Sequence, residues 1–485
     1  MRNYLLLLVI SSLPLAFAQA QEWLNLDFES PENQLTQLPE NWQHGRLIDS
    51  TILVKAPAVE GQAILLQGPF SDRNSGYAYQ EAKVEYPALT QFKVTGRIKT
   101  QDVSGEGAYL YAYGKQGDAY LGYTLSDTIN GTKDWSTVSF TFVGDPRMEK
   151  IRLGCYLGGS GKAWFDDLKW EQLPFSEPKL SADASIYLDS FFHTVSTLAL
   201  DKESFDWKLL REEAELLSGN AEIPEDTYAA IRYCLGKINK HSRFIDPRQA
   251  ALWASGGNSE DNPVLPPIEY CHGYRVDEDI AYLSMPGLGS GHQPTLTSFA
   301  DSLQQLIASL DGPQIKGWVV DLRNNTGGNC WPMLAGIGPL LGEGICGYFM
   351  DRDGSNAVDW SYREGSSFNG EYAATTVSDT PYQLQQPLKR IAVLTGPQTA
   401  SSGEITAIAF RGLPQVQSFG QPTAGYSTTN ATIRLPDGAM LLLTISIYGD
   451  RNKVPFGEQI YPDVLVAEQE GEDLPLLEAL HWLRE

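Results

Sequence analysis

Apolar and polar side chains alternate along the first third of the chain, from residue 22 to about residue 173. Short apolar-aromatic runs such as 92–94, 109–113 and 138–142 are separated by Gly, Asp and Asn. A two-residue period is typical of antiparallel strands, and turns at this spacing indicate a β-sandwich. We therefore predict an all-β module over residues 21–174.

The pattern changes after a Pro- and Ser-containing break at residues 171–183, which we interpret as a linker. Apolar residues then recur at helical spacing over 184–200 and 205–218, and Pro224 begins a further helix. A helical segment is therefore expected over residues 184–262.

Strands and helices alternate from about residue 266 onward. The pattern predicts strands at 280–283, 317–323 and 391–395, and helices at 296–310 and 404–410. Such alternation indicates βαβ units and a partly parallel sheet, whose functional sites gather at the carboxyl ends of the strands. We therefore expect an α/β domain over residues 263–485, so that the chain is multidomain.

Composition and charge limit which kinds of molecule the protein is expected to bind. The chain has 485 residues and a formal net charge of −24. This length suits two or three domains, and this charge repels phosphate backbones, so nucleic acid is not an expected partner. Of the five cysteines, Cys330 and Cys346 are candidates for a disulfide, with buried thiols as the alternative.

The first 20 residues are typical of a secretory signal peptide. Arg2 precedes an apolar stretch that begins with Leu5–Ile10, and small residues suited to cleavage follow at positions 16, 18 and 20. No later stretch reaches about 18 uninterrupted apolar residues, so no integral membrane segment is expected. The protein is thus predicted to be exported, to the periplasm or the extracellular space.

Two polar motifs lie at expected strand ends. Thr399-Ala400-Ser401-Ser402-Gly403 follows a strand and opens a helix, where backbone N–H groups and the helix dipole favour a developing negative charge. Asp321–Asn329 holds two adjacent glycines, which let the backbone approach a ligand. Alone, the first motif could be an ordinary helix cap and the second an ordinary tight turn.

Together, and in this order, the motifs resemble the S41 family of serine peptidases, which includes C-terminal-processing and tricorn-type enzymes. The chain matches the family's D-L-R-x-N-x-G-G loop, T-A-S-x-x-E turn, G-x-x-T-x-G segment at 420–425 and closing Pro462-Asp463. The resemblance covers about residues 185–470. It implies a ClpP/crotonase-like α/β catalytic domain, a polypeptide substrate, an acyl-enzyme, and neither metal nor cofactor.

Carried over by position, Ser401 falls on the nucleophile. The oxyanion hole falls on the backbone N–H of Ser402 and on that of Gly327 or Gly328. One branch of the family activates the serine with a Lys, but Tyr426 occupies that position here, and Tyr with a pKa of about 10 is a poor base at neutral pH.

The tricorn-type branch instead uses a His at the end of the helical segment. His241, followed by Ser242, lies at that place, with His272 and His292 as competitors. A His has a free pKa of about 6.5, which suits a general base. The resemblance implies that an acid orients the His, and Glu458 is the candidate.

The ends of the N-terminal module resemble the first and last strands of jelly-roll carbohydrate-binding modules. Asp27, Glu29 and Asp166 could hold a structural Ca²⁺ or be solvated carboxylates. Exposed aromatics stack on sugars whereas strand aromatics more often fill a core, so carbohydrate remains a second candidate ligand. The tyrosines concerned include Tyr77, Tyr79, Tyr109, Tyr111, Tyr113 and Tyr120.

The sequence thus predicts an exported serine endopeptidase of the C-terminal-processing kind. Too few residues separate His241 from the strand at 280 for a PDZ domain, so the β module is the candidate targeting part. The alternatives are a non-catalytic ligand-binding protein on the same scaffold and an esterase directed by the β module.

Overall fold

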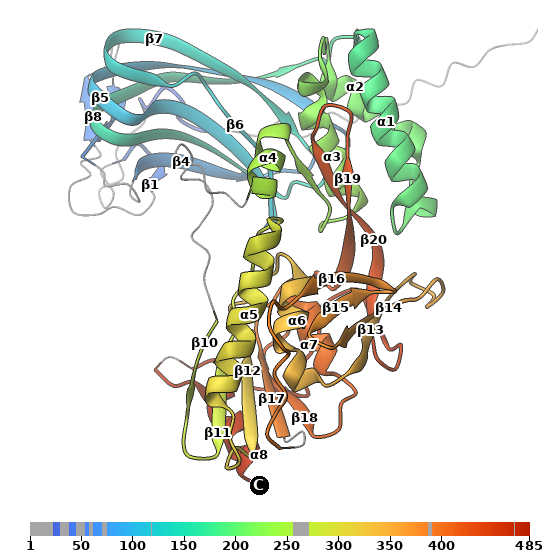
Figure 1. Ribbon diagram of the computed structural model, residues 1–485. Coiled ribbons are helices and arrows are strands. Elements are labelled where there is room, and N and C mark those ends of the chain that lie inside the picture. The colour runs from blue at the N-terminus through green and yellow to red at the C-terminus, as the bar shows by residue number, and fades with distance from the viewer. Residues whose placement is uncertain are drawn as a thin grey trace, which may run out of the picture. The chain divides into compact units, whose positions relative to one another are not determined.

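The chain divides into two units, Met1–Glu177 and Pro178–Glu485 (Figure 1). The predicted signal peptide lies outside the residues that the computed structural model describes. Those residues are 23–29, 38–44, 54–57, 62–69, 75–117, 119–255, 271–386, 390–469 and 471–485.

Every regular element described in the first unit is a strand. The first half of β5 pairs with β7 and the end of β8, and its second half pairs with β6 and the start of β8. The two long strands therefore bend and belong to both layers of a sandwich. Gly159 lies at the bend, where a Cβ atom would come 1.9 Å from the Ser104 carbonyl oxygen. The strands are β1 (Gln43–His44), β2 (Val54–Pro57), β3 (Gln62–Gln67), β4 (Ser75–Lys83), β5 (Thr90–Gln116), β6 (Ala119–Leu125), β7 (Ile129–Gly144) and β8 (Lys150–Leu173).

The two faces of the layer β4-β8-β5-β6 differ, because neighbouring residues of a strand point to opposite sides. One face buries small and aliphatic side chains such as Ala78, Leu110 and Leu153 in the core. The other carries the tyrosines singled out in the sequence, together with Tyr123, Tyr156 and Arg152. None of these tyrosines belongs to the core cluster on the other face, although Tyr111 and Tyr113 are buried among their neighbours.

The second unit begins with helices. Ser181 and Asp206 cap the first two α-helices by accepting the backbone N–H groups of Ala184 and Leu209. Their apolar faces share a core with α3 and with a β-hairpin from the C-terminal part. The elements are α1 (Ala182–Leu198), η1 (Lys202–Ser204), α2 (Trp207–Ser218), η2 (Pro224–Thr227), α3 (Tyr228–Ile238), β9 (Arg243–Ile245) and α4 (Pro247–Ser255).

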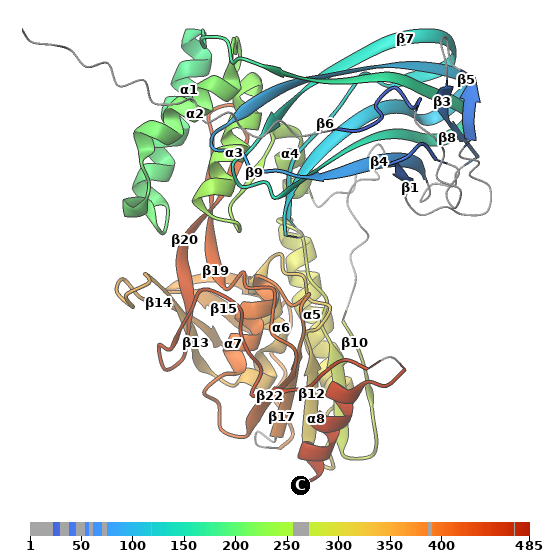
Figure 2. The same ribbon diagram turned by 180° about the vertical axis from the view of Figure 1, so that it is seen from behind.

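A six-stranded sheet of order β10-β11-β12-β17-β18-β22 follows, parallel except for β10. Its central strands are buried on both faces: Trp318 and Val320 pack in the core with α5, α6 and α7, whereas Val319 packs against α8 (Figure 2). The strands are β10 (His272–Arg275), β11 (Ile280–Ser284), β12 (Gly317–Asp321), β17 (Arg390–Thr395), β18 (Val416–Gly420) and β22 (Val464–Leu465). The helices are α5 (Gln293–Leu310), α6 (Cys330–Leu341), α7 (Ser402–Phe410) and α8 (Leu474–Arg484).

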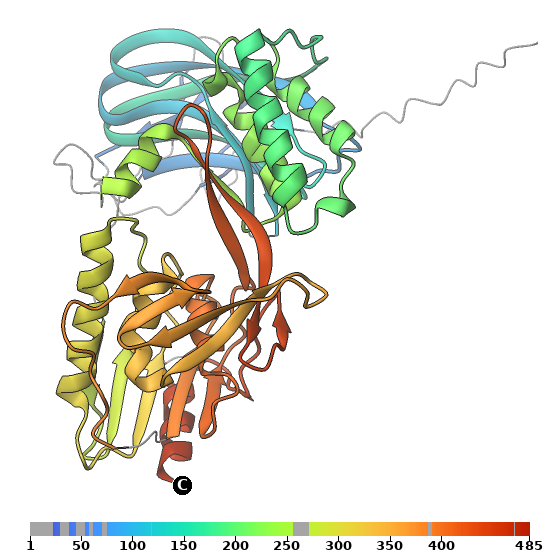
Figure 3. The same ribbon diagram turned by 45° about the vertical axis from the view of Figure 1, so that its right-hand side comes forward.

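A second, antiparallel sheet connects the helices with the α/β part. Its strand β20 pairs with β9 at one end, through Met440 and Ile245, and with β13 at the other. The β19–β20 hairpin therefore runs from the helical segment to the sheet β13–β16 (Figure 3). The strands are β13 (Gly344–Met350), β14 (Val358–Arg363), β15 (Ser366–Asn369), β16 (Tyr372–Thr376), β19 (Thr428–Arg434), β20 (Met440–Asp450) and β21 (Pro455–Phe456).

The predicted fold class is confirmed: an N-terminal β-sandwich is followed by helices and then by an α/β domain. The helices and the α/β part form one unit. All five cysteines are free thiols, so Cys330 and Cys346 are not bridged. Within the described ranges, no helix combines the length and the apolar character needed to cross a membrane.

Candidate active site

Ser401 occupies a strained turn between β17 and α7. It is the N-cap residue of α7 and has a φ of 51° and a ψ of −109°. A positive φ is costly for a residue with a Cβ atom, and such strain is concentrated at functional sites. The turn is held by the backbone N–H of Ser401, which donates to the Glu404 carboxylate over 2.8 Å.

His241 follows the end of α3, at the place that the sequence predicts for the base. Its backbone N–H donates to Asn239 Oδ1 at 2.8 Å, and its carbonyl accepts Asn430 Nδ2 at 3.0 Å. The ring Nε2 lies 3.0 Å from Ser401 Oγ, although the two residues are 160 positions apart. The structure therefore brings the predicted nucleophile and base within hydrogen-bonding distance.

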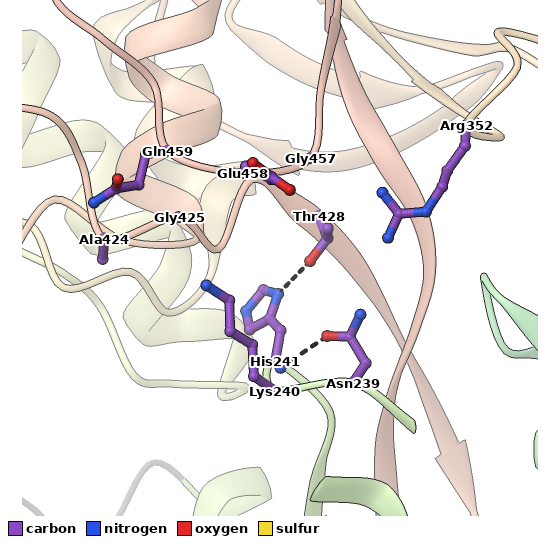
Figure 4. A pocket seen from close by; sticks show the side chains of 10 residues that line it. All are labelled: Asn239, Lys240, His241, Arg352, Ala424, Gly425, Thr428, Gly457, Glu458 and Gln459. Carbon is purple, nitrogen blue, oxygen red and sulfur yellow. Dashed lines mark hydrogen bonds between the residues drawn. The ribbon is translucent and has the colours of Figure 1, made fainter. Parts of the chain in front are cut away.

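The other ring nitrogen of His241 contacts a hydroxyl group. Nδ1 lies 2.7 Å from Thr428 Oγ1, at the start of β19. Glu458 shares a pocket of about 380 Å³ with His241 and Thr428 (Figure 4), and its backbone carbonyl accepts the Ser427 hydroxyl. The structure thus does not place the Glu458 carboxylate in hydrogen-bond contact with His241, because Thr428 takes that position.

The electrostatic environment keeps His241 neutral. Burial lowers its pKa to about 4, and the nearby positive charges of Arg243 and Lys240 act in the same direction. If Nδ1–H donates to Thr428, the Nε2 lone pair is free to accept the Ser401 proton. The ring can then act as a general base throughout the neutral range.

Of the two glycines predicted as oxyanion donors, Gly327 lies directly against the Ser401 turn. A Cβ atom on Gly327 would lie 2.9 Å from Ser401 Cβ and 3.2 Å from the Ser402 nitrogen, so only glycine allows this approach. The N–H of Gly327 donates to Asn325 Oδ1 at 3.0 Å. Across the described segments, neither the Ser402 N–H nor the Gly328 N–H donates a hydrogen bond. These two groups are available to a ligand.

Glu404 does more than cap its helix, which is the role that the sequence indicates. Its side chain is fully buried and accepts the backbone N–H groups of Ser401, Gly425 and Tyr426 and the hydroxyl of Thr423. Burial raises its pKa, while these four hydrogen bonds oppose the shift. One carboxylate thus joins the nucleophile turn to the segment that leads into Thr428.

The competing histidines lie elsewhere. His272 is exposed on β10. His292 is the N-cap residue of α5 without a side-chain capping bond, and its Nδ1 atom lies 3.1 Å from Thr295 Oγ1. The sequence favours His241 over these two residues, and the structure places the His241 ring beside Ser401.

The three acids considered for Ca²⁺ contact other groups: Asp27 Oδ1 accepts the backbone N–H of Glu29. Glu29 accepts the backbone N–H of Gln62, and burial raises the pKa of Asp166 to about 6. No group of three or more His, Cys, Asp or Glu side chains suited to a metal occurs in the part of the chain that the structure describes.

Residues 279–466 match the model of peptidase family S41. The chain therefore contains an S41 peptidase domain, which confirms the family resemblance.

Three relatives illustrate the similarity. The chain is 34% identical over 190 residues to a nisin-resistance protein of Lactococcus lactis subsp. lactis, covering 39% of this chain and 57% of that protein. It is 29% identical over 173 residues to the chloroplastic carboxyl-terminal-processing peptidase 2 of Arabidopsis thaliana, covering 34% of this chain and 30% of that one. A lipoprotein structure from Streptococcus agalactiae aligns with 64% of this chain and 99% of its own, at 25% identity and a TM-score of 0.51. The chain thus spans less than two thirds of either curated relative.

Proposed function

We propose that this protein is a serine-type endopeptidase that cleaves polypeptides through an acyl-enzyme on Ser401. The observation that carries the proposal is the 3.0 Å distance between His241 Nε2 and Ser401 Oγ at a strained strand-to-helix turn. The S41 domain supports peptide bonds as the substrate. Export, expected from residues 1–20, is part of the proposal.

The reaction follows from the arrangement of these groups. His241 takes the Ser401 proton as the hydroxyl attacks a substrate carbonyl, and the N–H groups of Ser402 and Gly328 donate to the oxyanion. Gly327, the other predicted donor, would first have to release its bond to Asn325. His241 then protonates the leaving amine, and water hydrolyses the acyl-enzyme with the same His as base.

The test is labelling with an activated phosphonate, which reacts with nucleophilic serines. Wild-type protein should be labelled at Ser401, and Ser401→Ala and His241→Ala should not, with circular dichroism showing that both variants fold. Ser309→Ala is the matched control, because its hydroxyl is exposed on α5. Labelling of Ser401→Ala at the wild-type rate would refute the nucleophile.

The alternatives give different results in the same experiment. A non-catalytic binding protein on this scaffold would remain unlabelled and would not cleave casein or a peptide library. An esterase directed by the β module would be labelled and would cleave esters but no amide of the same acyl group.

A second function is supported by the tyrosine face of the β-sandwich. Tyr109 stacks on Tyr156 with ring centroids 4.5 Å apart, and the Arg152 guanidinium lies 3.7 Å from the Tyr79 ring centroid. Tyr120 and Tyr123 are 65% and 54% exposed. Because aromatic faces combined with polar tips suit sugar rings, we propose that this face binds carbohydrate.

A glycan array probed with the full chain tests this second function. Tyr120→Ala and Tyr123→Ala should no longer bind the glycans that wild-type protein binds. Tyr372→Ala, which removes a 73% exposed tyrosine of the other unit, should not. Wild-type protein that binds no glycan, or Tyr variants that bind as the wild type does, would contradict the assignment.

A further inference from the structure

His241 is held from two sides by strand β19. Thr428, the first residue of β19, contacts Nδ1 of the ring at 2.7 Å, and Asn430 donates to the backbone carbonyl of His241 at 3.0 Å. Thr428 is only 4% exposed, so bulk water does not compete strongly for its hydroxyl. One strand therefore sets both the place and the rotation of the imidazole.

We propose that Thr428 is the positioning residue of the base, in the role for which the sequence suggests Glu458. This inference rests on the proposed serine peptidase function. Thr428 Oγ1 accepts Nδ1–H and thereby directs the Nε2 lone pair at Ser401. The orienting group of this site is thus a neutral hydroxyl rather than a carboxylate.

A hydroxyl orients a ring less strictly than a carboxylate does, because it can donate as well as accept. If Thr428 donated to Nδ1, the proton of His241 would lie on Nε2 and face Ser401, and the ring could not act as a base. The productive arrangement requires another acceptor for the Thr428 proton. The pocket beside Thr428 has room for water, and Glu458 is the acidic residue on its wall (Figure 4).

The charges around the ring favour its neutral form. Lys240 and Arg352 line the same pocket as Glu458, and Arg243 follows two residues after His241. Arg352 is paired with Asp201 on the surface. With a neutral partner on Nδ1 and cations nearby, the imidazolium formed during attack gains little stabilisation from its orienting residue, so the contribution of Thr428 is mainly geometric.

Three variants test the proposal: Thr428→Val removes the hydroxyl at nearly constant size, Thr428→Ser keeps it, and Thr432→Val changes an exposed Thr on the same strand. We expect Thr428→Val to lower kcat by about 10²-fold or more with little change in KM, since a positioned base contributes about 10²–10⁴-fold. Thr428→Ser should recover to within about tenfold of the wild type, and Thr432→Val should equal it.

Phosphonate labelling separates failure of this inference from failure of the proposed function. If wild-type protein is labelled at Ser401 but Thr428→Val reacts as fast, Thr428 is not the positioning residue. The same conclusion holds if Thr428→Ser is as slow as Thr428→Val. If wild-type protein is not labelled at all, the serine peptidase proposal itself fails.

A spectroscopic measurement reports the tautomer directly. In protein carrying ¹⁵N-labelled histidine, the His241 resonances, assigned with His241→Gln, should show a protonated Nδ1 in the wild type and in Thr428→Ser. Thr428→Val should show a mixture of tautomers, whereas an unchanged spectrum would overturn the role of Thr428.

Discussion

The Glu404→Gln substitution tests the view that one buried carboxylate holds the active site together. Oε2 accepts the backbone N–H groups of Ser401 and Tyr426, each at 2.8 Å, while Oε1 accepts the Thr423 hydroxyl and the Gly425 N–H. Gln has nearly the same shape but replaces one oxygen with an NH₂ group. Turned toward Ser401 and Tyr426, that NH₂ group would leave two backbone donors without an acceptor. Turned toward Thr423 and Gly425, it would leave one, the Gly425 N–H, because the Thr423 hydroxyl can accept as well as donate.

The cost follows from the one donor that stays unpaired in the better of the two orientations. A buried donor without an acceptor costs about 1–3 kcal/mol, so Glu404→Gln should lower the free energy of unfolding by about that amount. Proteins are stable by only about 5–15 kcal/mol in total. At about 2 °C per kcal/mol for a unit of this size, Tm should fall by roughly 2–6 °C.

The assay combines thermal unfolding with the rate of phosphonate labelling below the transition. Labelling should slow more than about tenfold, because Ser401 loses the anchor of its strained turn. Glu203→Gln, at an exposed position, is the control and should change neither quantity. If Glu404→Gln matched the wild type in Tm and labelling rate, the reasoning about this carboxylate would be wrong.

The other predictions concern pH, backbone strain and packing. Because the pKa of His241 is about 4 in the folded protein and about 6.5 in an unfolded chain, only the unfolded state binds the proton between these values. Activity should therefore persist to about pH 5, and the free energy of unfolding should fall by about 3 kcal/mol from pH 7 to pH 4. Urea titrations of wild-type protein and His241→Gln across that pH range isolate the contribution of His241. If the free energies of unfolding of the two proteins fall in parallel, His241 makes no such contribution. Gly327→Ala should abolish labelling, since a Cβ atom would lie 2.8 Å from the Ala400 carbonyl oxygen at a φ of 100°. Gly354→Ala, also at positive φ but in open space, is its control, and equal labelling of the two variants would contradict this reading. Phe299→Ala, in the core of the second unit, should cost about 3–5 kcal/mol in urea unfolding, and a loss below about 1 kcal/mol would exclude tight packing there.

Much of the fold can be predicted from local pattern. The buried strands at 317–323 and 391–395 have apolar residues on both faces, and the structure shows β12 and β17 between helical layers. The antiparallel sheet β13–β16 is harder to predict, because its strands are short and mix polar with aromatic residues. Its pairing also depends on β20, because Gly347 of β13 pairs with Asp450, 103 residues further along the chain.

The candidate active site can likewise be predicted only in part from the sequence. Ser401 and His241 are accessible from sequence because each lies in a recognisable local motif. The partner of His241 Nδ1 cannot be predicted in this way. It depends on which residue of β19 faces the ring, and that is decided by the register in which β19 pairs with β20. Thr428 carries no motif of its own, whereas Glu458 attracts attention as an acid. Likewise, Glu404 looks like an ordinary cap until its contacts with residues 423–426 are seen.

The position of β20 at the junction of the sheet has a consequence for the order of synthesis. A ribosome makes His241 first, Ser401 160 residues later, and the β19–β20 hairpin after both. The imidazole is seated only when β9 joins β20 and Thr428 reaches the ring. A nascent chain therefore carries Ser401 and His241 unassembled until the β19–β20 hairpin has emerged, so the proposed peptidase activity is expected only after that point.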